Sequence, residues 1–153
     1  MTRRVAIAAD HGGYPLKVEL GAWLQDGGYD VVDLGAHELD PLDDYPDFAS
    51  AAAEAIVSGQ VERAIVFCGS GAGASIAANK VPGVRAAVCH DTYSAHQAVE
   101  HDDMNILCIG ARVIGGAVAR ELVTAFLTAD LLDDPKYHRR LAKVASIEQR
   151  SIK

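Results

Sequence analysis

The sequence has no long hydrophobic run. None of its apolar stretches approaches the roughly 20 residues that a membrane-spanning helix needs. The apolar run at residues 5–9, which follows two arginines, is also too short for the hydrophobic region of a signal peptide. We therefore expect a cytoplasmic protein that has no membrane partner.

Positive charge is scarce as well. The chain has 14 Lys and Arg residues against 21 Asp and Glu residues, a formal net charge of −7. Nucleic acids and anionic membranes are bound by clustered lysines and arginines that displace counterions. The composition therefore argues against a nucleic-acid partner, and any anionic ligand is expected to be small and held by a few local cations.

Cysteine is rare, and its three positions do not have the spacing of a metal site. We therefore expect no disulfide and no metal site. Cys89 and Cys108 lie in apolar stretches and are expected to act as small buried hydrophobic residues. Cys68 differs from them because a glycine-rich loop follows it directly.

The chain also lacks repeats, low-complexity tracts and linkers rich in glycine or proline, so residues 1–153 are expected to form one domain. Apolar runs alternate with segments of helical period, which indicates a parallel sheet between two layers of helices. The expected strands are residues 5–9, 30–34, 63–67, 85–89 and 105–109. The expected helices are residues 15–27, 46–58, 73–81, 92–102 and 116–128, followed by a C-terminal helix at 136–149.

Reactive residues follow the ends of these strands. Asp10 and His11 come after the first strand, Cys68 ends the third, and Arg112 follows the fifth. In an open parallel sheet, ligands bind beyond the carboxyl ends of the strands. We therefore expect the functional site at this edge of the sheet.

The loop at residues 69–73 leads from a strand into a helix, so its backbone N–H groups and the helix N-terminus point toward one place. This arrangement suits an anion, either a phosphate or an enediolate. The loop also satisfies the pattern G-x-G-x-x-[GA], and Asp91 lies at about the right distance for a ribose contact. A dinucleotide-binding module is therefore an alternative, although that fingerprint normally occupies the first strand-to-helix turn.

Two residues suit proton transfer. The position of Cys68, at the end of a buried strand and facing a helix N-terminus, favours the thiolate that a base or nucleophile needs. His101 lies near the end of an expected helix among acidic neighbours, which favours its protonated form and suits a general acid. A buried hydrophobic role for the cysteine and a capping role for the histidine are the alternatives.

Several cations could hold a phosphate group. Arginine offers a planar, bidentate fork and lysine a point charge. The candidates are Arg112, Lys136, Arg139 and Arg140. The alternative is that these residues form a solvated helix face.

Four stretches together resemble the B-type ribose-5-phosphate isomerases. They are ADHGG at 9–13, DYP at 44–46, CGSGAGASIAANK at 68–80, and the segment from Glu100-His101 to Arg112. The resemblance covers nearly the whole chain and implies a flavodoxin-like or Rossmann-like α/β/α fold with a five-stranded parallel sheet. It also implies an aldose–ketose isomerase that interconverts ribose 5-phosphate and ribulose 5-phosphate, in a homodimer or tetramer whose active sites combine both chains of a dimer.

The same resemblance implies a role for each candidate residue. His101 would open the sugar ring, and Cys68 would move a proton between C2 and C1 through a cis-enediolate, without a cofactor. Ser70 and the amides of Gly69, Gly71, Ala72 and Gly73 would form the anion hole. Asp10 would contact hydroxyls and assist ring opening, Tyr45 would wall the pocket, and His11, Arg112, Lys136 and Arg140 would gather the phosphate.

The chain departs from the family pattern near the expected substrate. Asp102 replaces an asparagine, Lys136 an arginine and Tyr137 a histidine. Ala74 stands where some members have a glutamate, which leaves the cysteine as the base. An isomerase of another sugar phosphate, such as allose or galactose 6-phosphate or a tetrose phosphate, and a catalytically silent relative are therefore further alternatives.

Overall fold

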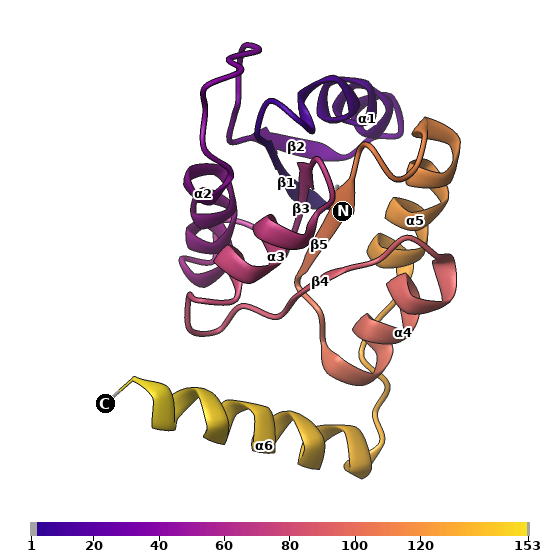
Figure 1. Ribbon diagram of the computed structural model, residues 1–153. Coiled ribbons are helices and arrows are strands. Elements are labelled where there is room, and N and C mark those ends of the chain that lie inside the picture. Colours follow the sequence, from indigo (N-terminus) through magenta and orange to yellow (C-terminus); the bar gives the residue numbers. More distant parts are fainter. Residues whose placement is uncertain (1–2, 153) are drawn as a thin grey trace.

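Five parallel strands form one sheet. The computed structural model describes residues 3–152. The strands are Arg4–Ala9 (β1), Asp30–Asp33 (β2), Arg63–Cys68 (β3), Ala86–Val88 (β4) and Ile106–Gly110 (β5). They lie in the order β2-β1-β3-β5-β4 and every neighbouring pair is parallel, which confirms the expected fold class (Figure 1). The last two strands are exchanged relative to the flavodoxin order 2-1-3-4-5.

Helices follow the strands in the expected alternation. They are Tyr14–Asp26 (α1), Tyr45–Val57 (α2), Ala72–Ala78 (α3), Thr92–Asp102 (α4), Gly116–Thr128 (α5) and Pro135–Ser151 (α6). Successive side chains of a strand point to opposite faces of the sheet. On one face, Ile7 and Phe67 pack with α1, α4 and α5, and on the other face Ala8 and Cys68 pack with α2 and α3. Cys68 is therefore held between β3 and the glycine loop that leads into α3.

Most expected boundaries differ from the observed ones by one or two residues, and two of the differences have a cause in side-chain contacts. The third helix ends at Ala78 instead of residue 81 because the side-chain amide of Asn79 bonds to both the N–H and the carbonyl of Ala86. The fourth strand begins at Ala86 instead of residue 85 because the N–H of Arg85 donates to the side chain of Asn105, at 2.8 Å, outside the strand ladder. In both places a side chain replaces a backbone partner, which a periodic pattern does not reveal.

A buried lysine anchors the loop between β2 and α2. Lys17 is only 1% exposed, and its Nζ donates to both carboxylate oxygens of Asp33, at 2.6 and 2.8 Å, and to the carbonyl of Ala36, at 2.6 Å. A buried ammonium must be paired and hydrogen-bonded in this way to be tolerated. The beginning of the loop is therefore fixed beside the carboxyl end of β1, where the backbones of Ala36 and Ala9 also bond.

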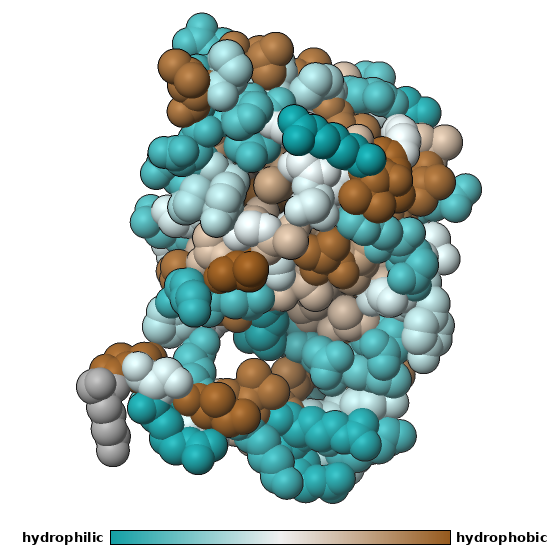
Figure 2. Space-filling model, in the orientation of Figure 1, coloured by the Kyte–Doolittle hydropathy of each residue, from teal (hydrophilic) through white to brown (hydrophobic). Residues whose placement is uncertain are grey.

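The C-terminal helix α6 stands apart from the sheet and contacts α4 (Figure 1). The space-filling view shows an open gap between α6 and the body, with apolar side chains beside it (Figure 2). A cavity of about 310 Å³ there is lined by Val84, Leu141 and Val144, among others. Among residues 3–152, no helix combines the length and the apolarity needed to cross a bilayer.

Candidate active site

A cavity of about 420 Å³ opens at the carboxyl ends of β1 and β3. These two strands are neighbours, and the chain leaves β1 toward β2 on one side and returns to β3 on the other. Such a topological switch point is where open α/β sheets bind ligands. The cavity is lined by Asp10, His11, Gly12, Tyr45, Cys68, Gly69, Ser70, Gly73, Arg112 and Val113. It therefore brings together most of the expected site residues, and adds Gly12 and Val113, which carried no chemical signal in the sequence.

The centre of the cavity is a thiol beside a carboxylate. The Sγ of Cys68 donates to Oδ2 of Asp10 across 3.7 Å, and Asp10 Oδ1 accepts the N–H of Gly13. Both side chains are 7% exposed. The thiol proton therefore has an oxygen acceptor within the site, while the nearby N-terminus of α3 offers N–H donors that favour the thiolate.

The other two cysteines are inert by comparison. Burial raises the pKa of Cys89 to about 11 and raises the pKa of Cys108 further. All three cysteines are free and buried. Cys89 and Cys108 therefore remain protonated hydrophobic groups near neutral pH.

The glycine loop forms the floor of the cavity. The Oγ of Ser70 accepts the N–H of Ala72 at 3.2 Å, which turns the loop into α3. In the part of the chain that the structure describes, the backbone N–H groups of Gly69, Ser70 and Gly71 have no protein acceptor. These free donors beside Cys68 are suited to stabilising negative charge on a ligand.

Tyr45 and Arg112 form the side walls of the cavity. A Cβ added at Gly73 would lie 2.8 Å from Cζ of Tyr45, so only glycine lets the ring lie against the start of α3. The backbone N–H of Arg112 donates to the carbonyl of Gly69, which holds the start of its side chain over the loop. These positions are compatible with the expected roles of Tyr45 as a wall of the pocket and of Arg112 as a cation that binds the phosphate.

His11 is held by a residue that sequence reasoning missed. Oδ1 of Asp43 accepts the backbone N–H of His11 at 2.9 Å and lies 2.6 Å from its ring Nδ1. The hydrogen bond with Asp43 is the main reason why the pKa of His11 is raised, and the charge of Asp10 adds to it. Asp43 lies in the acidic loop before α2, where nothing in the sequence distinguishes it from its neighbours.

A second group of expected residues gathers where α4 meets α6. We call His101, Lys136, Tyr137 and Arg140 the α4–α6 cluster. The rings of His101 and Tyr137 stack with centroids 4.2 Å apart, and the tyrosine hydroxyl lies 2.9 Å from Nε2 of His101. The amide nitrogen of Gln97 lies 2.8 Å from Nδ1. Because an amide N–H₂ only donates, the ring proton of neutral His101 lies on Nε2 and points to Tyr137.

Two cationic side chains of α6 lie close to the ring of Tyr137. Lys136 Nζ lies 4.7 Å and Arg140 Cζ 5.9 Å from the centroid of its ring. A hydrogen bond with Asp134, at 3.1 Å, raises the pKa of Lys136. Asp102 ends α4 next to His101 and is exposed. All residues of the α4–α6 cluster therefore lie on two helices that do not contribute to the cavity.

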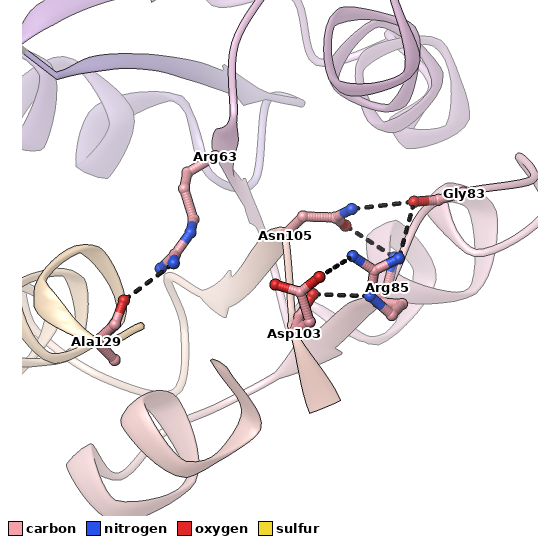
Figure 3. A network of polar contacts seen from close by, with 6 residues as sticks. All are labelled: Arg63, Gly83, Arg85, Asp103, Asn105 and Ala129. Atoms are coloured by element: carbon pink, nitrogen blue, oxygen red, sulfur yellow. Dashed lines mark hydrogen bonds and ion pairs between the residues drawn. The ribbon is translucent and has the colours of Figure 1, made fainter. Parts of the chain in front are cut away.

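A polar network at the amino edge of the sheet holds the end of α4 (Figure 3). Arg85 donates to the carbonyl of Asp103, the residue after α4, at 2.7 Å and to its carboxylate at 2.8 Å. The side chain of Asn105 bonds to the carbonyl of Gly83 and to the N–H of Arg85. His101 is therefore fixed near the amino edge.

The cavity and the α4–α6 cluster are not joined within one chain. Cys68 is the last residue of β3, whereas α4 runs back along the sheet and ends beside the start of β5. A strand of five residues such as β5 spans about 17 Å. His101, Asp102, Lys136 and Arg140 consequently lie at the opposite edge from the thiol.

A further cavity of about 420 Å³ lies at the amino edge, beside Arg3, Arg4 and Arg63. Arg63 donates to the carbonyl of Phe126 in α5 and to that of Ala129, which directly follows this helix; Figure 3 shows the contact with Ala129. Burial lowers the pKa of Arg63. Arg3 bonds to the carbonyl of Leu127, and Arg4 pairs with Asp30. These arginines therefore cap the end of α5 and form ion pairs with Asp30 and Asp130.

The structure does not favour the alternative of a dinucleotide-binding module, because Asp91 has another role. Oδ1 of Asp91 accepts the N–H of Ser94 at 2.7 Å, which caps α4 and lowers the pKa of Asp91. The glycine loop follows β3 and not the first strand. Between residues 3 and 152, no group of three or more His, Cys, Asp or Glu side chains is arranged to hold a metal ion.

Known proteins resemble this chain over nearly its full length. The family described as Ribose/Galactose Isomerase matches residues 5–144. The chain is 40% identical to ribose-5-phosphate isomerase B of Escherichia coli (strain K12), over 97% of this chain and 98% of the relative. It is 43% identical to the D-erythrulose-4-phosphate isomerase of Pectobacterium atrosepticum, over 82% and 83%.

A solved structure is similar to this chain in both sequence and fold. Ribose-5-phosphate isomerase B of Clostridium thermocellum is 45% identical, with a TM-score of 0.92 and coverage of 97% of this chain and 99% of that chain. The match includes the strands and loops that form the cavity as well as the α4–α6 cluster. The chain therefore belongs to the ribose/galactose isomerase family.

Proposed function

We propose that this protein is an aldose–ketose isomerase that interconverts ribose 5-phosphate and ribulose 5-phosphate. The observation that carries the proposal is the Cys68 thiol, paired with Asp10 above a loop of free backbone N–H groups. Relatives named for this reaction match the chain over nearly its whole length, whereas the matched tetrose-phosphate isomerase covers a smaller share. Ribose 5-phosphate is therefore the favoured substrate.

Proton transfer begins on the open-chain aldose. Cys68, as thiolate, takes the proton from C2, and the electrons of that C–H bond form the C1–C2 double bond while the aldehyde oxygen becomes an oxyanion. A proton moves from the O2 hydroxyl to O1 in the resulting cis-enediolate. Cys68 then returns its proton to C1 and the C2 carbonyl forms. Asp10 beside the thiol can store the thiol proton before the first step.

The oxyanion forms beside the glycine loop. The free N–H groups of Gly69, Ser70 and Gly71 and the Ser70 hydroxyl can donate to the enediolate oxygens. Donors that are already in place cost no reorganisation when the charge develops, and each is worth about 3 kcal/mol in such sites. The amide of Gly73 in the first turn of α3 extends this anion hole, whereas the expected amide of Ala72 already donates to Oγ of Ser70.

Ring opening and phosphate binding require the α4–α6 cluster as well. We infer that Cys68 of one subunit works with His101 of the partner subunit in a homodimer or higher oligomer, because the two residues lie at opposite edges of one chain. His101 supplies the proton for ring opening, and the stacked ring and hydroxyl of Tyr137 fix the orientation of its imidazole. Lys136 and Arg140 join His11 and Arg112 at the phosphate, and Asp102 contacts a hydroxyl.

The exposed side of α6 supports this assembly. Val144 and Ile147 are 50% and 57% exposed on a helix that stands off the body (Figure 2). An amphipathic helix with an uncovered apolar stripe needs a partner surface. A second copy of the chain is the partner that would also complete the site.

The substrate can be tested directly. The rate of ketose formation from ribose 5-phosphate should exceed the rates from allose 6-phosphate, galactose 6-phosphate and erythrose 4-phosphate, and EDTA should leave it unchanged. If only one of the other sugars reacts, the protein is still an aldose–ketose isomerase. We would then attribute its different substrate to Asp102, Lys136 and Tyr137. Activity on none of them would contradict the proposed function.

Subunit mixing tests the shared site. Cys68→Ala and His101→Asn proteins should each be strongly impaired, and a mixture that exchanges subunits should regain about one quarter of wild-type activity. The reason is that half of the dimers are mixed and each of these has one intact site of two. Mixed dimers detected by native mass spectrometry without any recovery would mean that both residues act within one chain.

A further inference from the structure

The carboxylate of Asp43 makes two bonds with one oxygen and none with the other. Oδ1 accepts the backbone N–H of His11 at 2.9 Å and contacts the ring Nδ1 at 2.6 Å. Oδ2 is buried and has no partner among the described residues, and the side chain as a whole is only 10% exposed. A buried carboxylate is tolerated only when its charge is balanced nearby. The imidazole of His11 is the basic group in direct contact with it.

This geometry determines where the proton of His11 lies. An ionised carboxylate only accepts hydrogen bonds, so Nδ1 must carry a hydrogen. Nε2 is then the ring nitrogen left for a ligand, and His11 lines the cavity of Cys68. When the ring is protonated, Nε2 also carries a hydrogen and becomes a cationic donor.

The charges around His11 favour that protonated form on balance. Asp43 and Asp10 both raise the pKa of His11, whereas burial and the guanidinium of Arg112 lower it, and the hydrogen bond with Asp43 is the largest of these effects. Tyr45 and Cys68 also line the cavity. A bound phosphate dianion would favour the imidazolium further.

Asp43 is held firmly enough to act in this way. Its loop begins at the segment that Lys17 anchors through Asp33 and Ala36. The loop ends at α2, whose first residue, Tyr45, walls the same cavity. Both ends of the loop are therefore fixed to elements that build the site.

We propose that Asp43 is a positioning residue of this site, which locks His11 with a proton on Nδ1 and keeps it an imidazolium, so that Nε2–H donates to the phosphate group of the substrate beside Arg112. That the ligand is a phosphate rests on the proposed function. The effect of Asp43 on the protonation of His11 is independent of it. Because His11 loses its positive charge when the pH rises through its raised pKa, its contribution to phosphate affinity should be lost over that pH range.

Imidazole NMR tests the coupling without any turnover. In the ¹⁵N-labelled full-length protein, with His11 assigned through His11→Gln, Nδ1 should stay protonated across the titration. Asp43→Asn should lower the pKa of His11 toward its ordinary value of about 6.5. Asp44→Asn is the matched control, since it removes one charge from an exposed neighbour whose side chain makes no capping bond, and should change little. An unprotonated Nδ1, or an unchanged pKa in Asp43→Asn, would overturn the proposal.

Inorganic phosphate tests the consequence. Asp43→Asn should weaken phosphate binding at pH 7 by about tenfold, the scale of one charge-assisted hydrogen bond, while Asp44→Asn stays within about twofold of the wild type. His11→Gln, which keeps Asp43, should weaken binding similarly and leave only the pH dependence that comes from the ionisation of phosphate itself, so the question is answered even if Asp43→Asn does not fold. Equal affinity in the wild type and His11→Gln would overturn the role in phosphate binding, and the absence of ribose 5-phosphate turnover would count only against the proposed function.

Discussion

Replacing Cys68 with alanine should lower kcat for ribose 5-phosphate by about a thousandfold or more and leave KM nearly unchanged. A positioned acid or base contributes roughly 10²–10⁴-fold to a rate, and Cys68 is the group placed to serve both proton transfers. Alanine keeps the backbone of β3 and the loop donors in place, so substrate binding should persist. The Asp10 carboxylate would remain in the cavity, but in the proposed mechanism it accepts the thiol proton and does not take the proton from C2.

The measurement should include exchange of the C2 proton as well as turnover. In D₂O, the wild-type enzyme should incorporate deuterium from solvent into the sugar, and Cys68→Ala should lose this incorporation together with ketose formation. Cys89→Ala is the matched control, because Cys89 is also buried but lies outside the cavity. Near-normal turnover of Cys68→Ala would show that another group transfers the proton.

Gly13→Ala should lower the free energy of unfolding by about 3 kcal/mol, the upper range for overpacking a tight site. A Cβ at this position would collide with the backbone carbonyl of Phe67 and lie 2.6 Å from the N–H nitrogen of Cys68. Backbone atoms of a central strand cannot rotate away, so β1 and β3 would have to separate at the site. In a chain of this size, the melting temperature should fall by roughly 6–12 °C.

The same substitution should also damage the site. The N–H of Gly13 donates to Oδ1 of Asp10, so a shift of residue 13 displaces the carboxylate that faces the thiol. Gly115→Ala is the control, since a Cβ there meets no atom within 4 Å and its φ of −93° suits any residue. Thermal unfolding followed by circular dichroism measures both variants, and equal melting temperatures would refute the packing argument.

The order of the elements could be predicted because it depends on local patterns. Runs such as residues 64–68 are continuously apolar, which is what a strand covered by helices on both faces requires. Once the sheet is known to be parallel, Asp10 and Cys68 must emerge at the same edge, and the pairing of β1 with β3 in the structure brings them together there. The roles of these residues came from the family resemblance and are still predictions.

Other features depend on contacts that no local pattern encodes. Asp43 and His11 lie 32 positions apart, and their pairing depends on the path of one loop that Lys17 anchors. Several aspartates in that loop were equivalent in the sequence, and only the loop conformation brings this one to the histidine. Tyr137 appeared in the sequence as a departure from the family pattern, without any sign that it would stack on His101.

The sequence by itself determined the strand and helix order, the edge of the sheet where Cys68, Asp10 and the glycine loop meet, and the cations available for a phosphate. These features follow from apolar periodicity and from the fixed direction of parallel strands. Only the tertiary structure decided that β5 lies between β3 and β4, that Asp43 holds His11, and that His101 lies at the far edge of the chain from Cys68. Such relations arise from loop paths and from side chains that meet across distant elements, and they become definite only when the elements are packed together.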